Sequence, residues 1–566
     1  MEGAHTRLSV ISVAAALPLV VMATTGTAGA VEVRDTDLVQ QAGEEWLHVN
    51  GDVWGRRYST LAQINADNAG ELKMAWLFST GGDTFHQATP VVHEGIIFFP
   101  QSYKVFAIDA RTGHRLWKHE QYPPEDLGGD NPDLFHGTHR GVALYGNNVY
   151  HLTQDNKIVA LDQKTGMLVF ETPRLRDYAK AYDKAEDANG YWSTVAPMAI
   201  PGKIIVPMNA TDTGGLPGFV IAVDPGSGDV LWEANMIPKP GEPGADTWPG
   251  NSADYGGGGP WITGTWDPET HIYYTGTANA MPWNPYGRGD GTMENTGAAS
   301  VVAVDTDAGK VVWRYTVVPG DPFDYDTMTV PMILTVNGKK TIVQPNKTGF
   351  MHYLDPASGK FLGAVPFADK ITWAESYGAD GRPINQVPLP KEGEPQIEIW
   401  PSLLGAVNLY PYAYNPDTGL VYLPSRHKSM LYGFEKVQYR AKAANFGAVF
   451  EFPEGGNEIN MAFDVAARKE AWRDQKAKDG FSGGMLTTAG NLVFYGTQGG
   501  IFQAVDATTG EILYTFNIGA TFKAAPMTYM IDGKQYVAGL AGHEPGLGNN
   551  DHPLEANGGY LYAFAR

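Results

Sequence analysis

AVDTDAGKVVW, residues 303–313, is the stretch that decides the fold, because its pattern returns along the chain. An apolar residue is followed two positions later by Asp, a small residue precedes a Gly, and an apolar or aromatic residue closes the copy. Five further clear copies are AIDARTGHRLW (107–117), ALDQKTGMLVF (160–170), AVDPGSGDVLW (222–232), YLDPASGKFLG (353–363) and AVDATTGEILY (504–514). Weaker relatives are AYNPDTGLVYL from Ala413 and FDVAARKEAW from Phe463.

Each copy predicts two strands joined by a tight turn that Asp and Gly make. Upstream of most copies lies another alternating apolar run, such as GIIFFP (95–100) or KIIVPM (203–208). A four-stranded sheet of this kind cannot bury both faces alone, so the copies must stack, with the closing aromatic wedged between neighbours. Counting all copies, we predict an all-β fold: one eight-bladed β-propeller of four-stranded antiparallel blades.

The composition agrees with many short strands, since 68 Gly, 38 Pro, 28 Tyr and 14 Trp occur in 566 residues. A net charge of −21 makes nucleic acid an unlikely partner, because phosphate binding requires a basic face. The absence of cysteine excludes disulfides, thiolate metal sites and a covalently attached c-type haem. Any electrons released by a redox reaction must therefore leave on a separate carrier.

The N-terminus predicts an export signal over residues 1–30. Arg7 precedes an apolar stretch from Leu8 to about Ala23, and Ala28-Gly29-Ala30 fits the small-x-small cleavage rule. An uncleaved membrane anchor is the alternative, although Pro18 interrupts this short stretch. No later segment is long and apolar enough to span a bilayer. We therefore expect the domain at 31–566 to be periplasmic or secreted.

Several loops carry polar residues that a turn does not require. GDPFDYDTMTVPMIL (320–334) contains Asp321, Asp324 and Asp326, which together could hold a hard cation through oxygen ligands. GTANAMPWN (276–284) offers the amide oxygen of Asn279. The plainer alternatives are a solvated acidic loop and an ordinary turn asparagine.

Three more loops extend this set. NATDTGGLPGF (209–219) places Asp212 before a Gly-rich turn, which its side chain could simply cap. GGGGPWITG (256–264) puts the flat indole of Trp261 behind four glycines that permit close backbone approach, although blade packing would equally use a Trp. QPNKTGF (344–350) supplies Lys347, which is either a positioned charge or a surface lysine.

Taken in this order, the motifs resemble the quinoprotein alcohol dehydrogenases, which use pyrroloquinoline quinone (PQQ). The resemblance runs from EEWLHVNGDVWGRRYSTLAQIN (44–65) to GGMLTTAGNLVFYGTQGGIFQAVDATTGEIL (483–513). GTANAMPWN looks like the family's metal-ligand loop, and FDYD looks like the loop of its catalytic aspartate. The family therefore implies a dehydrogenase with a quinone and a metal ion bound near the propeller axis.

The resemblance assigns roles position by position. Asp324 falls on the family's general base, and Trp261 falls on the indole that stacks on the quinone. The implied cofactor contacts are Gln87, Arg140, Thr194, Trp261, Lys347 and Asn408. The implied metal ligands are Asp212, Asn279, Asp324 and Asp326. Asp212 enters as a substitute, because the family's metal-binding Glu aligns near Thr213.

One resemblance to a part of the family bears on the metal, and one departure from the family pattern bears on the pocket. Members that use a lanthanide resemble this chain in having Asp326 two residues after the base, so a lanthanide is favoured over Ca²⁺. The family's adjacent cysteine pair, which packs on one quinone face, is replaced by DLFHGTHRG. Leu134, Phe135 or His136 must cover that face, in a pocket reshaped for a bulky or secondary alcohol.

The sequence thus predicts oxidation of an alcohol to an aldehyde or ketone, by hydride transfer to PQQ. Asp324 would act as general base, the metal ion as Lewis acid, and a separate carrier such as a soluble cytochrome c would accept the electrons. A quinoprotein acting on sugars or polyols stays open as an alternative. So does a non-enzymatic propeller scaffold of the cell envelope, which would need no polar cluster. A propeller hydrolase would need a nucleophile with its base, and no motif marks one.

Overall fold

The computed structural model describes residues 32–81, 86–122, 138–175, 194–214, 216–437, 446–474, 483–542 and 558–566. The predicted signal at 1–30 and the residues Leu134, Phe135 and His136 lie outside these ranges, so they stay predictions. Within the described ranges, no helix has the length and apolar character needed to cross a membrane. Residues Glu32–Arg566 form one compact unit.

Eight sheets of this unit each contain four antiparallel strands, which follow chain order except in sheet 8, where the early strand β2 takes the outer position. Sheets 1 to 4 are formed by β3 (Val91–His93), β4 (Ile96–Gln101), β5 (Lys104–Asp109) and β6 (Arg115–Glu120); β7 (Ala143–Tyr145), β8 (Asn148–Leu152), β9 (Ile158–Asp162) and β10 (Leu168–Glu171); β11 (Met198–Ile200), β12 (Lys203–Ala210), β13 (Leu216–Val223) and β14 (Val230–Asn235); and β15 (Thr265–Asp267), β16 (Ile272–Gly276), β17 (Ser300–Asp305) and β18 (Lys310–Thr316).

Sheets 5 to 8 are formed by β19 (Met332–Val336), β20 (Lys339–Pro345), β21 (Phe350–Leu354) and β22 (Phe361–Pro366); β26 (Ala413–Asn415), β27 (Leu420–His427), β30 (Asn457–Asp464) and β31 (Lys469–Asp474); β32 (Leu486–Thr488), β33 (Leu492–Gly496), β34 (Ile501–Asp506) and β35 (Ile512–Asn517); and β36 (Met527–Ile531), β37 (Lys534–Ala541), β38 (Gly559–Ala565) and β2 (Lys73–Gly81). The short β1 (Tyr58–Ser59) joins sheet 7 in parallel to β32.

The remaining elements are small. A three-stranded sheet is formed by β25 (Ile397–Ile399), β28 (Met430–Phe434) and β29 (Ala448–Glu451). In the chain, β25 precedes sheet 6, and β28 and β29 are inserted between β27 and β30 of that sheet. A separate pair is formed by β23 (Ser376–Tyr377) and β24 (Pro383–Ile384). The described helices are α1 (Asp35–Leu38), α3 (Thr211–Gly214), η1 (Ala69–Glu71), η3 (Ala245–Thr247), η4 (Ser252–Tyr255) and η5 (Pro285–Gly287). The prediction of an all-β class is therefore confirmed.

The repeat works as its sequence predicts. Asp109 accepts the backbone N–H groups of Arg111 at 3.0 Å and Thr112 at 2.9 Å, and Gly113 closes the turn at φ +74°. A Cβ at Gly113 would lie 2.7 Å from the ring of Trp76, which belongs to another sheet. The same contact pairs Gly166 with Trp117, Gly228 with Phe170, Gly309 with Trp232, Gly359 with Trp313 and Gly510 with Trp472. The closing aromatic therefore packs between neighbouring sheets on the next repeat's glycine.

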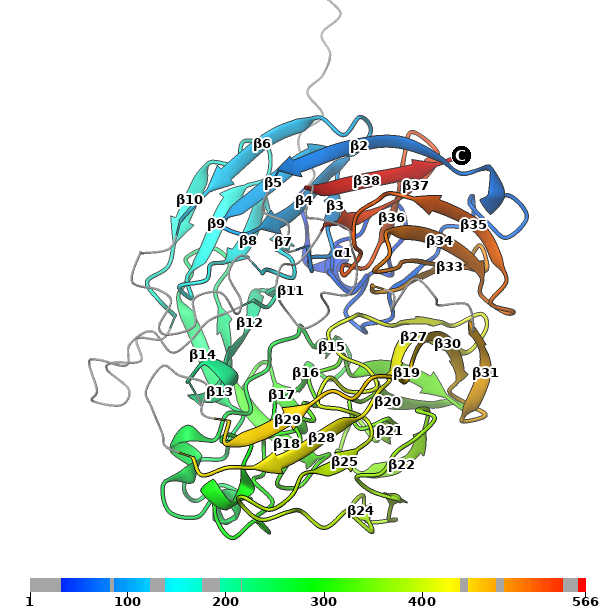
Figure 1. The fold of residues 1–566 in the computed structure, drawn as a ribbon. Helices are drawn as coiled ribbons and strands as arrows, with labels where there is room; N and C mark the ends of the chain where they lie inside the picture. The colour runs from blue at the N-terminus through cyan, green and yellow to red at the C-terminus, as the bar shows by residue number, and fades with distance from the viewer. Residues whose placement is uncertain are drawn as a thin grey trace, which may run out of the picture. The chain divides into compact units, whose positions relative to one another are not determined.

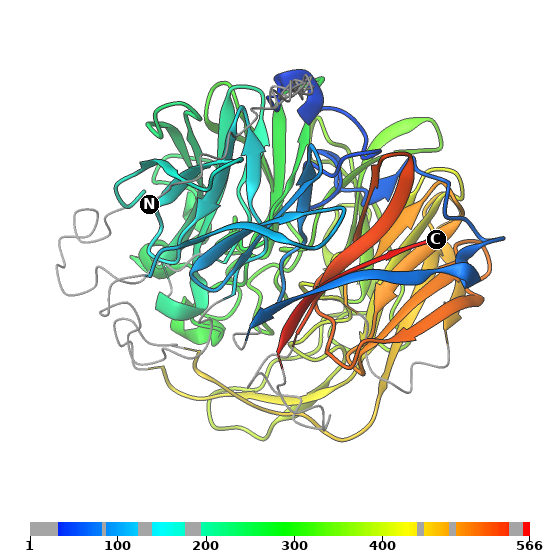
Figure 2. The same cartoon turned by 90° about the horizontal axis from the view of Figure 1, so that it is seen from above.

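The last sheet also contacts the first. The early strand β2 pairs antiparallel with β38, the final strand of the chain, and Figures 1 and 2 show the two side by side. Trp76 of β2 then donates its indole N–H to the carbonyl of Ala110 in sheet 1, at 3.1 Å. Sheet 8 is thus completed by a strand from the beginning of the described chain and packs against sheet 1.

One part of the repeat count was wrong. AYNPDTGLVYL does not mark a sheet of its own, because its turn joins β26 to β27 within sheet 6. The degraded copy from Phe463 supplies the usual turn of that same sheet, between β30 and β31. Sheet 8 carries no copy, since its outer strand is β2. The two weak copies therefore did not stand for two different sheets.

The N-terminal segment ties the inner ends of several sheets together. Arg57 is fully buried and donates to the carbonyls of Met485 and Pro526, both at 2.8 Å, and to the hydroxyl of Thr89 at 3.3 Å. These residues precede the first strands of sheets 7, 8 and 1. Satisfying a buried guanidinium with carbonyls from separate sheets fixes the sheets relative to one another.

Candidate active site

A cavity of about 470 Å³, its open mouth included, lies where the loops before several innermost strands meet. Three of the predicted cofactor residues line it: Gln87, Arg140 and Asn408. The other lining residues are Val49, Asn50, Thr89, Ile262, Thr263, Thr329, Val330, Leu409, Tyr410, Pro411 and Tyr412.

Arg140 connects two more of the predicted residues to this cavity. Its guanidinium donates to the hydroxyl of Thr194 and, at 3.2 Å, to the carbonyl of Trp261. The guanidinium carbon lies 4.8 Å from the centroid of the Trp261 ring. Burial lowers the pKa of Arg140 to about 9, and among the described residues no carboxylate forms an ion pair with it. A partly buried cation without a counter-ion is costly, so this one is placed to meet an anion that enters the cavity.

Gln87 and Asn408 differ in whether their side-chain amide groups already have hydrogen-bond partners. The side-chain oxygen of Gln87 is buried and has no hydrogen-bond partner. The Asn408 amide, in contrast, donates to the carbonyl of Leu404 at 3.0 Å and accepts the N–H of Leu409 at 2.7 Å. Gln87 therefore offers an unused acceptor to a ligand, whereas Asn408 mainly fixes the shape of its own loop.

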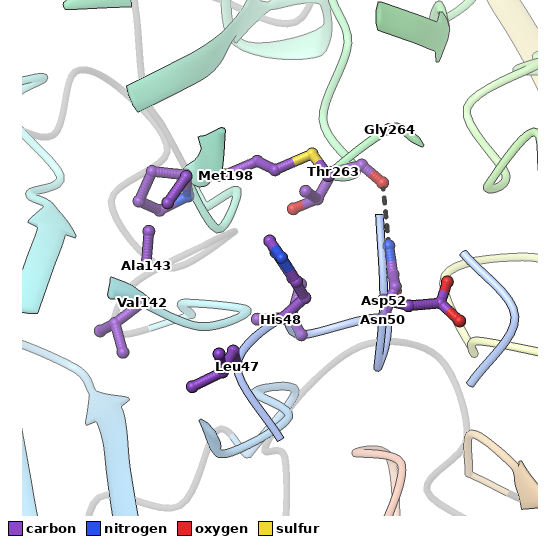
Figure 3. A pocket seen from close by; sticks show the side chains of 12 residues that line it. Leu47, His48, Asn50, Asp52, Val142, Ala143, Met198, Thr263 and Gly264 are labelled. Atoms are coloured by element: carbon purple, nitrogen blue, oxygen red, sulfur yellow. Dashed lines mark hydrogen bonds between the residues drawn. The ribbon is translucent and has the colours of Figure 1, made fainter. Parts of the chain in front are cut away.

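A second cavity of about 270 Å³ shares Val49, Asn50 and Thr263 with the first and is drawn in Figure 3. The His48 side chain extends into it, while the Asp52 carboxylate points away. The Nε2 of His48 lies 2.8 Å from the carbonyl of Leu38, and burial lowers the pKa of this imidazole. Asp52 accepts from Arg56 at 2.8 Å. The side chains of His48 and Asp52 thus have hydrogen-bond partners within the protein. They help to fix the residues that this cavity shares with the larger one.

The acidic loop that follows sheet 4 forms a second polar centre. The ammonium of Lys347 lies 2.9 Å from a carboxylate oxygen of Asp326, 3.2 Å from one of Asp324 and 2.8 Å from the Asp324 carbonyl. All three side chains are buried. The two carboxylates outweigh the burial that would lower the pKa of Lys347, so the pKa is raised and the ammonium stays charged. Lys347 is thus a positioned charge and not a surface lysine.

Asn279 and Asp212 belong to this same centre. The backbone N–H of Asn279 donates to Asp326 at 2.7 Å. Burial first, and then the charge of Asp326, raises the pKa of Asp212 to about 7. One side-chain oxygen each of Asn279, Asp212 and Asp324 is buried without a hydrogen-bond partner. Because buried polar atoms are nearly always paired, three unpaired oxygens in one place indicate a site for a ligand.

Asp324 has the most perturbed surroundings of the cluster. Its backbone lies in the left-handed region at φ +59°, which costs energy for a residue other than glycine. Burial raises the pKa of its carboxyl well above the ordinary value; Lys347 opposes this shift, and the charges of Asp326 and Asp212 add to it. Strain together with a raised pKa is typical of catalytic carboxylates.

The carboxylates do not form a complete metal site by themselves. Within the described ranges, no three Asp, Glu or His side chains converge in an arrangement that would hold a metal ion. A hard cation at this centre would therefore need the amide oxygen of Asn279 and oxygens from a ligand in addition to the carboxylates.

Comparison with known proteins decides the family. The model of the PQQ glucose, ethanol and alcohol dehydrogenase β-propeller domain matches residues 46–368 and 448–537. The chain belongs to the PQQ-dependent alcohol dehydrogenases. It is thus a quinoprotein oxidoreductase, as its motifs predicted.

Named relatives cover nearly the whole chain. The quinoprotein alcohol dehydrogenase PedH of Pseudomonas putida is 36% identical over 94% of this chain and 91% of the relative. Among solved structures, a europium-containing methanol dehydrogenase superposes with a TM-score of 0.83 at 27% identity, covering 94% of this chain and all of that chain. A quinohemoprotein alcohol dehydrogenase from Comamonas testosteroni gives 0.81 at 31% identity, covering 92% of this chain and 80% of that chain.

Asp321 is a structural residue of this dehydrogenase and not an open ligand. Its two carboxylate oxygens accept the backbone N–H groups of Phe323 at 2.9 Å and Tyr325 at 2.8 Å. Burial raises its pKa to about 6. The hypothesis that Asp321, Asp324 and Asp326 together hold a cation therefore needs correction, because Asp321 folds the loop that presents the other two.

The sequence reasoning missed Trp283, which lies in the same GTANAMPWN loop as Asn279. This indole is buried and near enough to Asp212 to lower the pKa of that carboxyl, and Phe446 stacks on it with ring centroids 4.1 Å apart. Phe446 comes from the segment that leads into β29, so the inserted three-stranded sheet reaches the candidate metal loop. The only signal in the sequence was that Trp283 and Asn284 follow Asn279 in the same loop. This signal does not distinguish a tryptophan that packs from one that functions.

Proposed function

We propose that this dehydrogenase oxidises an alcohol, including bulky or secondary alcohols, to an aldehyde or ketone with PQQ and one metal ion. Two features carry the proposal: the unpaired oxygens of Asn279, Asp324 and Asp212, and a cavity walled by Arg140, which forms no ion pair with a carboxylate among the described residues. A tricarboxylate quinone and a hard cation would satisfy both features together. When bound, the cation would supply a Lewis acid and the quinone a hydride acceptor for the alcohol carbon.

The cofactor would be held by residues with unused donors, acceptors or faces. Arg140 would pair with one of its carboxylates, with Thr194 beside it as a hydrogen-bond donor. Trp261, which Arg140 already contacts, would stack on one face. Gln87 would accept from the ring system through its unpaired oxygen, Lys347 would approach the quinone oxygens, and Asn408 would shape the opposite wall.

The metal ion would be held by Asn279, Asp324, Asp326 and the substitute ligand Asp212, with cofactor oxygens completing its shell. When a bound cation ionises all three carboxyls, they would outnumber the single charge of Lys347, which would suit a trivalent ion better than Ca²⁺. The superposition on a europium-containing methanol dehydrogenase supports the same choice. We therefore propose a lanthanide as the preferred ion and Ca²⁺ as the alternative.

Asp324 would act as the general base. In its deprotonated form it accepts the hydroxyl proton of the alcohol, and burial makes that acceptance favourable because the neutral carboxyl is the preferred state there. Lys347 holds the Asp324 side chain in place through both its carboxylate and its carbonyl.

The architecture belongs to the same proposal. We infer that the eight four-stranded sheets are eight blades of one closed ring, supported by the β2–β38 pairing and the Trp76 contact with sheet 1. We further propose that residues 1–30 direct export to the periplasm or outside the cell. The enzyme would then deliver electrons to a separate acceptor such as a soluble cytochrome c, because the chain has no cysteine to attach a haem.

Particular residues argue against two other functions. A non-enzymatic scaffold would not maintain unpaired buried oxygens beside a strained aspartate. A hydrolase could use Ser425, His427 and Asp369, whose side chains are linked at 2.7 Å and 2.8 Å. Ser425 is fully buried, however, and His427 Nδ1 also lies 3.1 Å from the backbone N–H of Asp369, so this trio stabilises strands and offers no accessible nucleophile.

The proposal is tested by reconstituting the purified full chain with PQQ and either La³⁺ or Ca²⁺. Dye-linked activity is then measured with primary, secondary and bulky alcohols, and with sugars and polyols as the alternative substrates. Alcohol-dependent dye reduction that requires both PQQ and the metal is expected. Absence of PQQ binding under all metal conditions would contradict the proposal, and activity restricted to sugars or polyols would favour the alternative.

A further inference from the structure

In the chain, the four glycines at 256–259 lie between sheet 3 and sheet 4, and all of them are buried. They follow η4 and continue through Pro260 into Trp261, whose carbonyl and ring contact the cavity residue Arg140. We call residues 256–259 the glycine strap. Its C-terminal end therefore lies next to a residue that would hold the cofactor.

The glycine strap is paired with the loop that carries Asn279. Three backbone hydrogen bonds join the two segments, from the N–H of Gly258 to the carbonyl of Asn279 at 3.0 Å, from Ala278 to Gly259 at 3.1 Å and from Met281 to Gly256 at 3.2 Å. This loop follows β16 in sheet 4. The strap thus fixes the backbone immediately before and after the proposed metal ligand.

The same strap is bonded to the hairpin that carries Asp212. The N–H of Gly259 donates to the hydroxyl of Thr211 at 2.9 Å, and the N–H of Gly218 donates to the carbonyl of Gly257 at 2.9 Å. Thr211 is fully buried and directly precedes Asp212, between β12 and β13 of sheet 3. Loops from two sheets, each with a proposed metal ligand, are therefore bonded to one short segment.

Only glycine fits where these segments meet. A Cβ at Gly257 would lie 2.8 Å from the side chain of Thr211 and 2.9 Å from the carbonyl oxygen of Asn279. A Cβ at Gly218 would lie 2.1 Å from the Cα of Gly259. Gly257 also adopts φ +69°, a conformation that favours glycine. The close approach that four successive glycines permit is thus used to hold the strap between the two ligand-bearing loops.

The side chain of Asn279 independently indicates a ligand at this place. Asn279 is fully buried, and its Oδ1 has no hydrogen-bond partner. Its Nδ2 donates to the carbonyl of Ala280 at 3.2 Å, so the loop itself orients the amide. An unpaired buried acceptor is costly, and a hard cation that binds oxygen would remove that cost.

We propose that the glycine strap is a positioning element that sets the distance between the metal-binding amide of Asn279 and the indole of Trp261. This inference rests on the proposed metal and cofactor sites. Because the strap is bonded to the Asn279 loop and reaches Trp261 two residues later, a change in its path moves one group relative to the other. A segment that only connected two sheets would not require hydrogen bonds to both ligand-bearing loops.

The first test measures amide hydrogen exchange in the cofactor-free full chain. Gly257→Ala should speed exchange in peptides covering residues 276–284 about tenfold, because the added Cβ pushes the loop away and frees the N–H groups of Ala278 and Met281. Gly250→Ala is the matched control. Gly250 has a similar φ of +61° in the same connection, and a Cβ there would meet no atom within 4 Å beyond its chain neighbours. Equal exchange of these peptides in the two variants would overturn the proposal.

The second test measures metal affinity. La³⁺ is titrated into the full chain in the presence of saturating PQQ, and the absorbance of bound PQQ reports the binding. Gly257→Ala should raise the La³⁺ concentration at half-saturation about tenfold, because the amide of Asn279 is displaced, whereas Gly250→Ala should leave it unchanged. The same half-saturation in both variants would contradict the proposal. If the unsubstituted chain binds neither PQQ nor La³⁺, the proposed function fails instead, and the exchange test still decides the role of the strap.

Thr211→Val serves where Gly257→Ala does not fold. Valine keeps the shape of threonine but cannot accept the N–H of Gly259, so La³⁺ should bind about fivefold more weakly. Thr528→Val is its control, because Thr528 is fully buried in sheet 8 and its hydroxyl accepts the amide N–H of Gln535 at 3.1 Å. The control should leave La³⁺ binding unchanged. Unchanged binding in Thr211→Val, or equal weakening in the two threonine variants, would overturn the positioning role.

Discussion

Asp305 and Asp324 lie in consecutive segments of the chain and differ in almost everything that matters chemically. Asp305 sits in a repeat turn and accepts the backbone N–H groups of Asp307 at 2.9 Å and Ala308 at 2.8 Å. Asp324 keeps one buried oxygen without a partner, in a strained backbone beside Lys347. The comparison teaches that a satisfied carboxylate maintains the fold, whereas an unsatisfied buried one is available for chemistry.

The largest effect on kcat is expected from a substitution of Asp324 itself. Asp324→Asn should lower kcat by about 10³-fold or more, because a general base contributes on this scale, while PQQ still binds. Dye-linked kinetics and cofactor titration measure the two properties. Asp305→Asn is the matched control and should retain kcat, since an amide oxygen can still accept the turn N–H groups. Equal losses in both variants would remove the distinction.

A substitution in the repeat should lower stability and leave catalysis unchanged. Trp76→Ala should lower the free energy of unfolding by about 3 kcal/mol, because it empties the contact between sheets 8 and 1. Urea denaturation measures this change, and kcat of the folded enzyme should stay the same. The neighbouring Leu77, 46% exposed, is the control, and Leu77→Ala should cost less than about 0.5 kcal/mol. A large loss of kcat in Trp76→Ala would contradict the separation.

The pocket wall should respond differently from the surface. Arg140→Met should weaken PQQ binding by about 100-fold, since a buried cation would no longer meet a cofactor carboxylate. Fluorescence or calorimetric titration with PQQ measures the affinity. Arg111, which is 51% exposed in its pair with Asp532, provides the control, and Arg111→Met should leave PQQ binding intact. Unchanged affinity in Arg140→Met would place the cofactor elsewhere.

Asp321 sharpens the comparison through pH. Its pKa is raised by burial to about 6 from 3.8, so the folded protein retains a proton that the unfolded chain loses between these values. The free energy of unfolding should therefore fall as pH rises from about 4 to 6, by roughly 2 kcal/mol from this group. Denaturation of cofactor-free protein at pH 4 and 7 measures the fall, which should be smaller in Asp321→Asn. An identical pH dependence would mean that Asp321 does not titrate in this range.

The smallest expected effect concerns the choice of ion. Asp326→Ser removes one carboxylate from the centre and should weaken La³⁺ binding about tenfold more than Ca²⁺ binding, because charge matters more for the trivalent ion. Competition titrations with PQQ present give both affinities. Equal losses for the two ions would show that Asp326 does not select by charge.

The fold was largely predictable because its signal is local and repeated. Asp109 and Gly113 act with residues within their own turn, and Trp76 needs only a glycine to pack against, so sequence alone exposes the pattern. The strand exchange that completes sheet 8 was not predicted, because β2 carries no repeat motif and its partner lies at the far end of the chain. Because sheet 8 has no copy of the repeat, a count of eight copies had to include the weak one at Ala413, which lies within sheet 6.

The site was predictable only in part. The family motifs placed Arg140, Thr194 and Trp261 together, and the structure brings these three into contact. It also joins Lys347 to Asp324 and Asp326. Spacing could not reveal that Asp321 is satisfied by backbone N–H groups while Asp324 is not, since both stand in one acidic loop. Satisfaction of a buried oxygen depends on three-dimensional packing.

The central claim is that side chains from separate sheets share one cation beside the quinone. A crystal of the full chain grown with PQQ and Eu³⁺, measured at the europium absorption edge, tests it most directly. The account predicts a single anomalous peak within coordination distance of oxygens from Asn279 and Asp324, with density for a planar ligand against Trp261. A peak bound elsewhere, or none between these two residues, would contradict it.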